Sequence, residues 1–298
     1  MLETITNIDS KYKVLTSKYT FAISFLSSLR KNKIAYISFW FLLLIHLFVF
    51  FTPLVWPFTP EELTDSGALS SWSWRHPFGT DDLSRDVFAR MLYGGRVTLL
   101  VGLLSMVFSL VIGTLVGACA GYFGKIVESV LMRITEAMMA IPNFFFVLVA
   151  LTVLGTSPSM VVIVIALSGW MEIARVVYGE TIKWKEYEFI EAANASGATN
   201  KRILFKYIIP QIIPSIIVSG TLTIAWAILT ESAISYLGLG IQPPTPTWGN
   251  MLQNAQSYIW TAPLLGILPG SAITLVVLAY NFLGDGLRDV LDPKSVKK

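Results

Sequence analysis

The chain has 298 residues, of which 54% are hydrophobic and only 14% are charged, and its formal net charge at pH 7 is +3. An average soluble domain carries roughly 25% charged residues, so a water-soluble globule of this size could not hide so much apolar surface. A disordered chain would need the opposite composition, with low hydrophobicity and high charge. The composition therefore indicates an integral membrane protein.

The first 33 residues are polar and basic, and they lack the apolar core and small-residue cleavage site of a signal peptide. After them, six stretches reach the ~20 apolar residues that a helix needs to cross a hydrocarbon layer about 30 Å thick. The sequence thus predicts an all-α, polytopic membrane protein with six transmembrane helices, at 34–56, 97–122, 134–154, 159–178, 212–237 and 262–283.

Lysine and arginine are distributed unevenly along the chain. Eighteen of the 22 lie in the N-terminal segment 1–33, in or next to the connections after the second and fourth spans, or in the tail 284–298, and only four lie in segment 57–96. Because positive residues accumulate in cytoplasmic loops, we expect both termini in the cytoplasm and segment 57–96 outside. Residues 97–283 then form a five-helix core with one long cytoplasmic loop, 179–211.

The outer segment carries signals of an amphipathic helix. Thr80 is a good N-cap, and the two acids that follow it suit the positive end of a helix. Leu83, Val87 and Met91 form one apolar stripe at helical spacing. We therefore expect an outer helix over 80–96, which braces the second span or, alternatively, contacts another protein.

The chemistry of a hydrolase or a metal enzyme is missing from the sequence. Gly124-Lys125 is not followed by the Ser or Thr of a phosphate-binding loop, and His46 and His76 have no partner at metal-ligand spacing. The single cysteine, Cys119, excludes an internal disulfide and a cysteine-based metal site. If the protein does energised work, the energy comes from a partner or from an ion gradient.

The cytoplasmic loop 179–211 predicts two short helices. Residues 185–195 contain few helix breakers, and Gly197 can end this first helix as its C′ residue. Thr199 can cap a second helix, which runs to Pro210 and enters the fifth span.

One face of the first loop helix would present Tyr187, Ile190 and Ala193 or Asn194. A short helix across the membrane face, ended by a glycine turn, is typical of a docking element. The alternative is an amphipathic helix that rests on lipid headgroups, but the three glutamates among its lysines weaken that interpretation.

The same loop resembles a known motif. The EAA triplet at 191–193, Gly197 and the Ile209-Pro210 pair are similar to the EAA motif of bacterial ABC importer permeases, with Ile209 in place of the usual leucine. Three other stretches resemble the C-type subunit of dipeptide, oligopeptide and nickel permeases: HPFGTDDLSRDVFARMLYGGR at 76–96, ESAISYLGLGIQPPTPTWGNML at 231–252 and LPGSAITLVVLAYNFLGDGLRDVLDP at 268–293.

The resemblance implies the type I permease fold of ABC importers, in the bacterial inner membrane. That family pairs a C-type with a homologous B-type permease subunit, two cytoplasmic ATPase subunits and an extracytoplasmic solute-binding protein. It implies that this chain is not an enzyme and binds no cofactor itself, because the partner ATPases use ATP and Mg²⁺; lipid surrounds it, and nucleic acid is not expected. Contact with the ATPase is then expected at six residues: Tyr187, Ile190, Glu191, Ala192, Ala193 and Gly197.

Three residues inside predicted spans could line a pathway or a gate: Glu231, Trp226 and Trp170. An ionised Glu231 in a span costs several kcal/mol unless it faces protein or water. It lines the pathway or steadies an outer gate, or it hydrogen-bonds neighbouring backbone or a partner subunit, or it is protonated. The two tryptophans are candidates on weaker grounds, since aromatic residues in membrane helices usually pack.

The expected function is therefore ATP-driven import of di- or oligopeptides, glutathione-like compounds, nickel or metal–chelator complexes. One rival is a gradient-driven secondary transporter or channel. That class favours ionisable residues deep in several spans and inverted repeats, whereas this sequence shows one such acid and no repeat. A membrane-anchored scaffold is a second rival.

Overall fold

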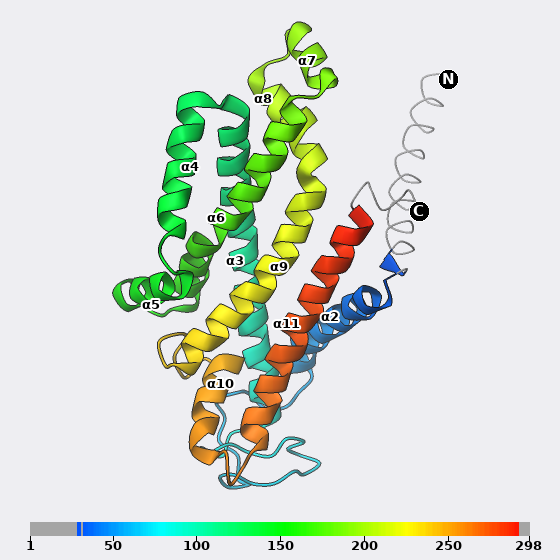
Figure 1. Ribbon diagram of the computed structural model, residues 1–298. Coiled ribbons are helices and arrows are strands. Elements are labelled where there is room, and N and C mark those ends of the chain that lie inside the picture. The colour runs from blue at the N-terminus through cyan, green and yellow to red at the C-terminus, as the bar shows by residue number, and fades with distance from the viewer. Residues whose placement is uncertain (1–28, 31, 292–298) are drawn as a thin grey trace, which may run out of the picture.

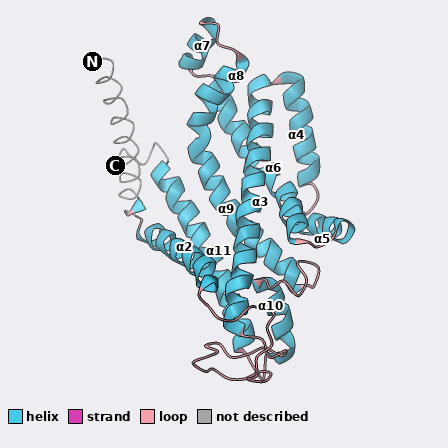
Figure 2. Ribbon diagram, turned by 180° about the vertical axis from the view of Figure 1, so that it is seen from behind, coloured by secondary structure: helices cyan, strands magenta, loops and turns pink. Residues whose placement is uncertain are grey.

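Helices make up nearly all the regular structure of the computed structural model, which describes residues 29–30 and 32–291 (Figures 1 and 2). Within those residues no strand occurs beyond two isolated bridges, so the predicted all-α class is confirmed. The helices are α2 (Lys33–Phe51), α3 (Val87–Phe123), α4 (Lys125–Met139), α5 (Asn143–Leu154), α6 (Pro158–Lys185), α7 (Glu188–Ala195), α8 (Asn200–Arg202), α9 (Ile209–Tyr236), α10 (Trp248–Ala255) and α11 (Leu264–Leu291), with a π-helical turn (Ile203–Ile208) between α8 and α9 and short 3₁₀ turns at Thr52–Leu54 and Gln256–Tyr258.

Five helical runs in the described part are long and apolar enough to cross a membrane: Lys33–Leu54, α3, α6, Asn200–Tyr236 and α11. The pair α4–α5 makes a sixth only if it is counted as one span, because the two helices are bent by 86°. The prediction of a single helix over 134–154 is therefore wrong at its centre. Pro142 lacks an N–H group and keeps Ile141 out of the helical region, so the helix ends there and α5 begins after it.

The predicted termini fall largely outside the described part. Of the N-terminal segment 1–33, residues 1–28 and 31 lie outside the described residues. The predicted tail 284–298 starts inside α11, which continues to Leu291, and the last seven residues again lie outside the description.

Glycines on α3 allow the closest helix contact in the bundle, with α6. Gly113, Gly117 and Gly121 lie four residues apart and face that helix. A Cβ on Gly113 would stand 2.6 Å from the carbonyl oxygen of Trp170, and one on Gly121 would stand 2.8 Å from the Cβ of Thr181. Small residues at this spacing let two membrane helices approach closely, so these glycines are packing residues.

The peripheral helix α2 is attached by specific polar contacts to α11 and α3 (Figure 1). The Nδ1 atom of His46 lies 2.7 Å from the Leu42 carbonyl oxygen, which can only accept. Nε2 is therefore left to accept from the Tyr280 hydroxyl at 3.2 Å. Arg96 of α3 donates to the Val49 carbonyl oxygen at 3.1 Å, in the last turn of α2, where a cation is favourable.

The outer segment differs from its prediction at the start. The expected helix over 80–96 does not begin at Thr80, because Asp81 accepts from two following backbone N–H groups, at 2.9 Å each, and forms a turn. The N-cap is Asp86, which accepts from the Ala89 N–H group at 2.8 Å. From there the helix continues unbroken as α3, so the second span starts ten residues earlier than predicted.

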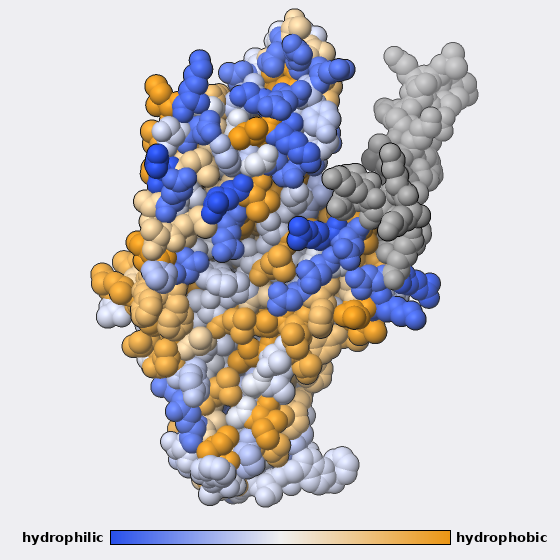
Figure 3. All heavy atoms as spheres, in the orientation of Figure 1, coloured by the Kyte–Doolittle hydropathy of each residue, from blue (hydrophilic) through white to orange (hydrophobic). Residues whose placement is uncertain are grey.

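Hydropathy divides the surface into zones that match a membrane orientation (Figure 3). Apolar side chains form a band across the middle of the molecule, and hydrophilic side chains gather at the end that carries α7 and α8. Exposed apolar residues occur on α2, α3, α5 and α11. The long α9 connects the α7 end to the opposite end, where α10 lies (Figure 1).

Candidate functional site

The predicted docking helix is α7, and a full glycine turn ends it. The N–H group of Ala198 donates to the Ala193 carbonyl oxygen at 3.1 Å, and that of Gly197 donates to Asn194 at 2.9 Å. These two bonds define a Schellman motif, and Gly197 has the positive φ of +76° that its C′ position requires. The predicted glycine stop is confirmed. The helix itself starts three residues later than expected, with Tyr187 as N-cap.

The second loop helix leads directly into α9. The side chain of Thr199 accepts from the Arg202 N–H group at 3.4 Å, as predicted for an N-cap. The backbone hydrogen bonds then change to the π-helical pattern over the turn Ile203–Ile208, just before Pro210. Pro210 has no N–H group and cannot continue the α-helical pattern. The chain nevertheless stays helical from Asn200 to Tyr236.

The two sides of α7 differ in burial. Ile190 is only 1% exposed and packs on Ile203, Leu204 and other apolar residues of the π-helical turn. Tyr187 is 44% exposed and stacks on Trp184, with ring centroids 4.7 Å apart. The predicted common helical face of Tyr187 and Ile190 does not form, because Tyr187 precedes the first helical turn and Ile190 is buried against the π-helical turn. Contact of these two residues with an ATPase stays a prediction.

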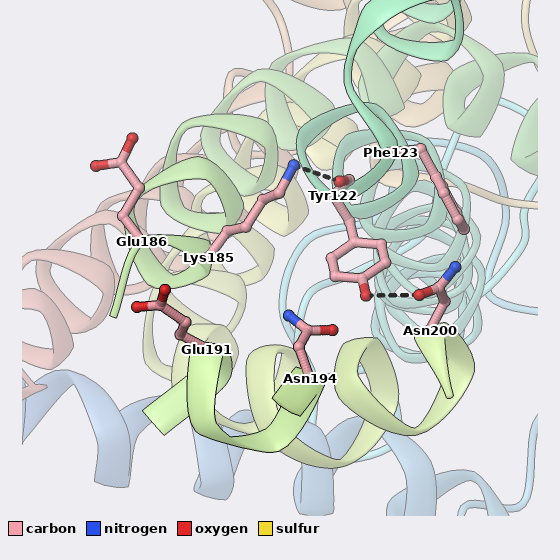
Figure 4. A pocket seen from close by; sticks show the side chains of 7 residues that line it. All are labelled: Tyr122, Phe123, Lys185, Glu186, Glu191, Asn194 and Asn200. Atoms are coloured by element: carbon pink, nitrogen blue, oxygen red, sulfur yellow. Dashed lines mark hydrogen bonds between the residues drawn. The ribbon is translucent and has the colours of Figure 1, made fainter. Parts of the chain in front are cut away.

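Open hollows flank α7 on both sides. One, of about 430 Å³, has seven lining residues (Figure 4): Tyr122, Phe123, Lys185, Glu186, Glu191, Asn194 and Asn200. The other, also about 430 Å³, lies beside Ala192, Ala193 and Gly197. The helix therefore projects as a ridge with Glu191 and Ala192 exposed on it.

Polar contacts fix the base of this ridge. The Nζ atom of Lys185 donates to the Tyr122 carbonyl oxygen at 2.6 Å, at the end of α3 (Figure 4). The Tyr122 hydroxyl donates to Oδ1 of Asn200 at 3.0 Å, at the start of α8. The ends of α3, α6 and α8 are thus tied together beneath α7.

Glu231 is enclosed within the subunit near the opposite end of α9. Its side chain is 0% exposed and so faces no open space in this structure; its predicted role at the pathway or the outer gate stays a prediction. It does hydrogen-bond its neighbours, but its partners are side-chain hydroxyls and not the backbone groups that the alternative interpretation predicted. Oε1 accepts from the Ser235 hydroxyl at 2.8 Å, and Oε2 accepts from the Thr98 hydroxyl of α3 at 3.1 Å. Sequence reasoning missed Thr98, although the i, i+4 spacing of Glu231 and Ser235 was visible.

The two candidate tryptophans also lie in packed surroundings. Trp170 is 8% exposed and packs with Met171 and Ala174 against α3 and α4, so it has no open face for cargo. Trp226 is half-buried, and its ring lies over Gly169 of α6. Its contact with cargo stays a prediction.

A second buried network holds the segment before α3. Oδ1 of Asp86 lies 3.0 Å from Nδ1 of His76, and Oδ2 accepts from the indole N–H of Trp56 at 2.9 Å. Arg90 pairs with Asp81 at 3.4 Å and donates to the Pro60 carbonyl oxygen at 3.2 Å. These contacts anchor the outer segment to α3. Among the described residues, no group of His, Cys, Asp or Glu is arranged to hold a metal ion.

Comparison with solved structures identifies the fold of this helical bundle. Two inward-facing forms of the MetNI methionine ABC transporter have the same fold, with TM-scores of 0.53 and 0.55 at 21% and 20% identity. The matches cover 67% and 68% of this chain and 96% and 97% of theirs. The fold is therefore that of an ABC importer permease.

The family follows from the sequence matches. Residues 109–297 match the model of binding-protein-dependent transport system inner membrane components, and the chain belongs to this family. Residues 20–71 match the N-terminal transmembrane domain of oligopeptide transport permease C. The C-type subunit that the sequence motifs indicated is thereby confirmed.

Curated relatives resemble the chain over most of its length. The dipeptide transport system permease protein DppC of Alkalihalophilus pseudofirmus is 40% identical over 89% of this chain and 88% of its own. The glutathione transport system permease protein GsiD of Pectobacterium atrosepticum is 38% identical over 85% of each. The oligopeptide transport system permease protein OppC of Haemophilus influenzae is 38% identical over 89% of this chain and 86% of its own.

Proposed function

We propose that this chain is the C-type permease subunit of an ATP-driven importer for peptides. The observation that carries the proposal is the 38–40% identity to dipeptide, oligopeptide and glutathione permeases across most of both chains. Among the cargoes that the sequence left open, these names favour peptides over nickel. The chain forms the pathway together with a homologous B-type permease.

The ridge formed by α7 is the proposed ATPase contact. Glu191, Ala192 and Ala193 lie on it or beside its hollows, and Tyr187 is exposed at its start. The small alanines let another backbone approach closely. Ile190 acts differently from what the motif suggested: it anchors the ridge to the π-helical turn, so a force on α7 passes into α9.

The remaining partners follow from the same proposal. Two ATPase subunits bind ATP and Mg²⁺ on the cytoplasmic side, and this chain binds no cofactor and catalyses no reaction. A solute-binding protein delivers cargo to the α10 end. The chain lies in the bacterial cytoplasmic membrane with the α7 end and both termini in the cytoplasm, which the distribution of lysine and arginine supports.

The geometry gives a gradient-driven mechanism little support. Ion-coupled transporters use ionisable side chains that face a cavity near the middle of the membrane. The acid predicted for such a role, Glu231, is enclosed and accepts hydrogen bonds at both oxygens.

Uptake by proteoliposomes tests the proposal. The purified complex is reconstituted and supplied with its binding protein and radiolabelled dialanine, trialanine or glutathione. We expect uptake that requires ATP, the ATPase subunits and the B-type permease, and that persists when ionophores collapse ion gradients. Uptake without the ATPases that ionophores abolish would contradict the proposal.

A further inference from the structure

Two hydrogen-bond relays end on the carboxylate of Glu231. In the first, the backbone N–H of Trp248 donates to the Thr98 hydroxyl at 3.2 Å, and this hydroxyl donates to Oε2 at 3.1 Å. In the second, the backbone N–H of Ile241 donates to the Ser235 hydroxyl at 3.2 Å, and this hydroxyl donates to Oε1 at 2.8 Å. Each hydroxyl has an N–H on its acceptor side, so its own proton is directed to the carboxylate.

The relays fix one segment, the connection 237–247 between α9 and α10, at its middle and at its far end. Ile241 lies within it, and Trp248 is the first residue after it. A carboxylate has only acceptor sites, which suits a position where both oxygens face hydroxyl donors. Glu231 therefore joins three parts of the chain: α9, which carries it, the connection, and α3 through Thr98.

Close backbone packing supports the same assembly independently. A Cβ on Gly249 would stand 2.6 Å from the Ser232 carbonyl oxygen, and one on Gly240 would stand 2.7 Å from the Ser235 backbone nitrogen. The side chain of Asn250 also donates to the Ile241 carbonyl oxygen at 3.2 Å. The connection thus lies directly against the last turns of α9, without space for it to shift on its own.

A continuous helix links this assembly to the α7 ridge. Ile190 of α7 packs against the π-helical turn. From this turn to Glu231 the chain runs through more than twenty helical residues, a length of about 35 Å at 1.5 Å per residue. A displacement of α7 therefore reaches Glu231 through one element.

We propose that Glu231 is a positioning residue that makes the connection 237–247 move with α9, so that ATP binding by an ATPase subunit in contact with α7 repositions the outer end of this chain. The inference rests on the proposed function, since it takes α7 as the ATPase contact. Glu231 acts through Thr98 and Ser235 and touches no cargo.

A cysteine reporter in the connection tests the proposal without any cargo. Gln242, which is exposed, is changed to Cys in a Cys119→Ser background, with cysteine-free partner subunits in the complex. The reaction rate with a membrane-impermeant maleimide is measured without nucleotide and after trapping with ATP and vanadate. Thr98→Val, which keeps the shape and removes the hydroxyl, is compared with Thr98→Ser, which keeps the hydroxyl.

We expect the two states of the unmutated reporter complex to differ in labelling rate by about threefold or more, the scale of one hydrogen bond. Thr98→Ser and the control Ser232→Ala, which removes only a 3.4 Å contact to Glu231, should retain this difference. Thr98→Val and Glu231→Gln should bring the ratio close to one in complexes that still contain every subunit.

Three outcomes would overturn the proposal. The labelling rate of the reporter complex does not depend on nucleotide, or Thr98→Val retains the full difference in labelling rate. The third is that the difference is lost in Thr98→Val only in complexes that also lack a subunit. None of them bears on the proposed function, because ATP-driven uptake by the wild-type complex is measured separately. Absent uptake in that complex would instead remove the function on which the proposal rests.

Discussion

The two ends of the helical run Asn200–Tyr236 are built in opposite ways. At the α7 end, a Cβ added to Gly197 would meet no atom within 4 Å, and hollows of about 430 Å³ lie on both sides of the ridge. At the α10 end, a Cβ on Gly249 would overlap the backbone of Ser232. Both ends use glycine, but for different reasons: at Gly197 the φ angle demands it, and at Gly249 the space does.

This contrast agrees with the proposal that the α7 end contacts another chain. A ridge with free space around it and a buried anchor has room for the surface of a partner. An end closed by internal hydrogen bonds and backbone contacts needs no partner to hold its shape. We infer that α7 receives force and that the α10 end follows as one body.

The largest expected effect is at the closed end. Gly249→Leu should prevent stable folding, because the new side chain meets backbone atoms at 2.6–2.7 Å that cannot move aside, at a cost of about 3 kcal/mol or more. The yield of monodisperse permease complex on size-exclusion chromatography measures it. Gly270→Leu is the control, since its Cβ has only an ordinary contact at 3.6 Å; equal losses in both variants would contradict this interpretation.

The second-largest effect is expected at Ile190, the buried residue that attaches α7 to the π-helical turn. Ile190→Ala removes a fully buried side chain and should weaken the attachment of α7 by about 2–5 kcal/mol without altering any span. Hydrogen exchange of the α7 amides in the purified complex reports this local opening. Phe189→Ala, at a neighbouring residue that is 40% exposed, should change exchange little. Unaltered protection in Ile190→Ala would show that α7 is held in another way.

A smaller energetic effect with a clear functional consequence is expected at Gly197. Gly197→Leu strains a residue with φ of +76°, at a cost of about 1–2 kcal/mol, and places a side chain in the open space beside the ridge. The complex should assemble, but cargo uptake per ATP hydrolysed should fall. Gly179→Leu, also in open space but without a positive φ, is the matched control. Normal coupling in Gly197→Leu would argue against α7 as the coupling element.

The mildest change concerns the second loop helix. Thr199→Ala removes the N-cap of α8 and should cost about 1 kcal/mol, whereas Thr199→Ser keeps the hydroxyl and should cost less. The Arg202 N–H group donates to the Thr199 hydroxyl. We therefore expect the Arg202 amide to exchange faster in Thr199→Ala than in Thr199→Ser. If the two variants exchange equally fast, the cap does not hold this turn.

The sequence predicted those parts of the fold that depend on hydropathy and on local turn chemistry. The spans follow from apolar length, and the Schellman turn at Gly197 and the cap at Thr199 follow from residue type. The break at Pro142 inside the predicted span 134–154 was missed, because sequence alone does not show whether neighbouring helices satisfy the backbone groups that a proline leaves without partners.

Side-chain contacts, one set local and one long-range, explain the remaining differences. Asp81 and Thr80 have the composition of a helix start, but Arg85 and Arg90 recruit Asp81 into a folded turn. The partners of Glu231 lie as far as 133 positions away in the sequence, at Thr98, and no local pattern reveals such a contact. At these two places, side-chain contacts rather than helix propensity determined the structure.

Site-specific photocrosslinking during ATP turnover tests the difference between the two ends most directly. A photoreactive residue at Ala192, on the ridge, and another at Trp74, which is 90% exposed in the outer segment, are compared in the same reconstituted complex with its binding protein. The account predicts that position 192 crosslinks to an ATPase subunit with a yield that changes with nucleotide, and that position 74 never does. An ATPase crosslink from position 74, or none from position 192, would contradict it.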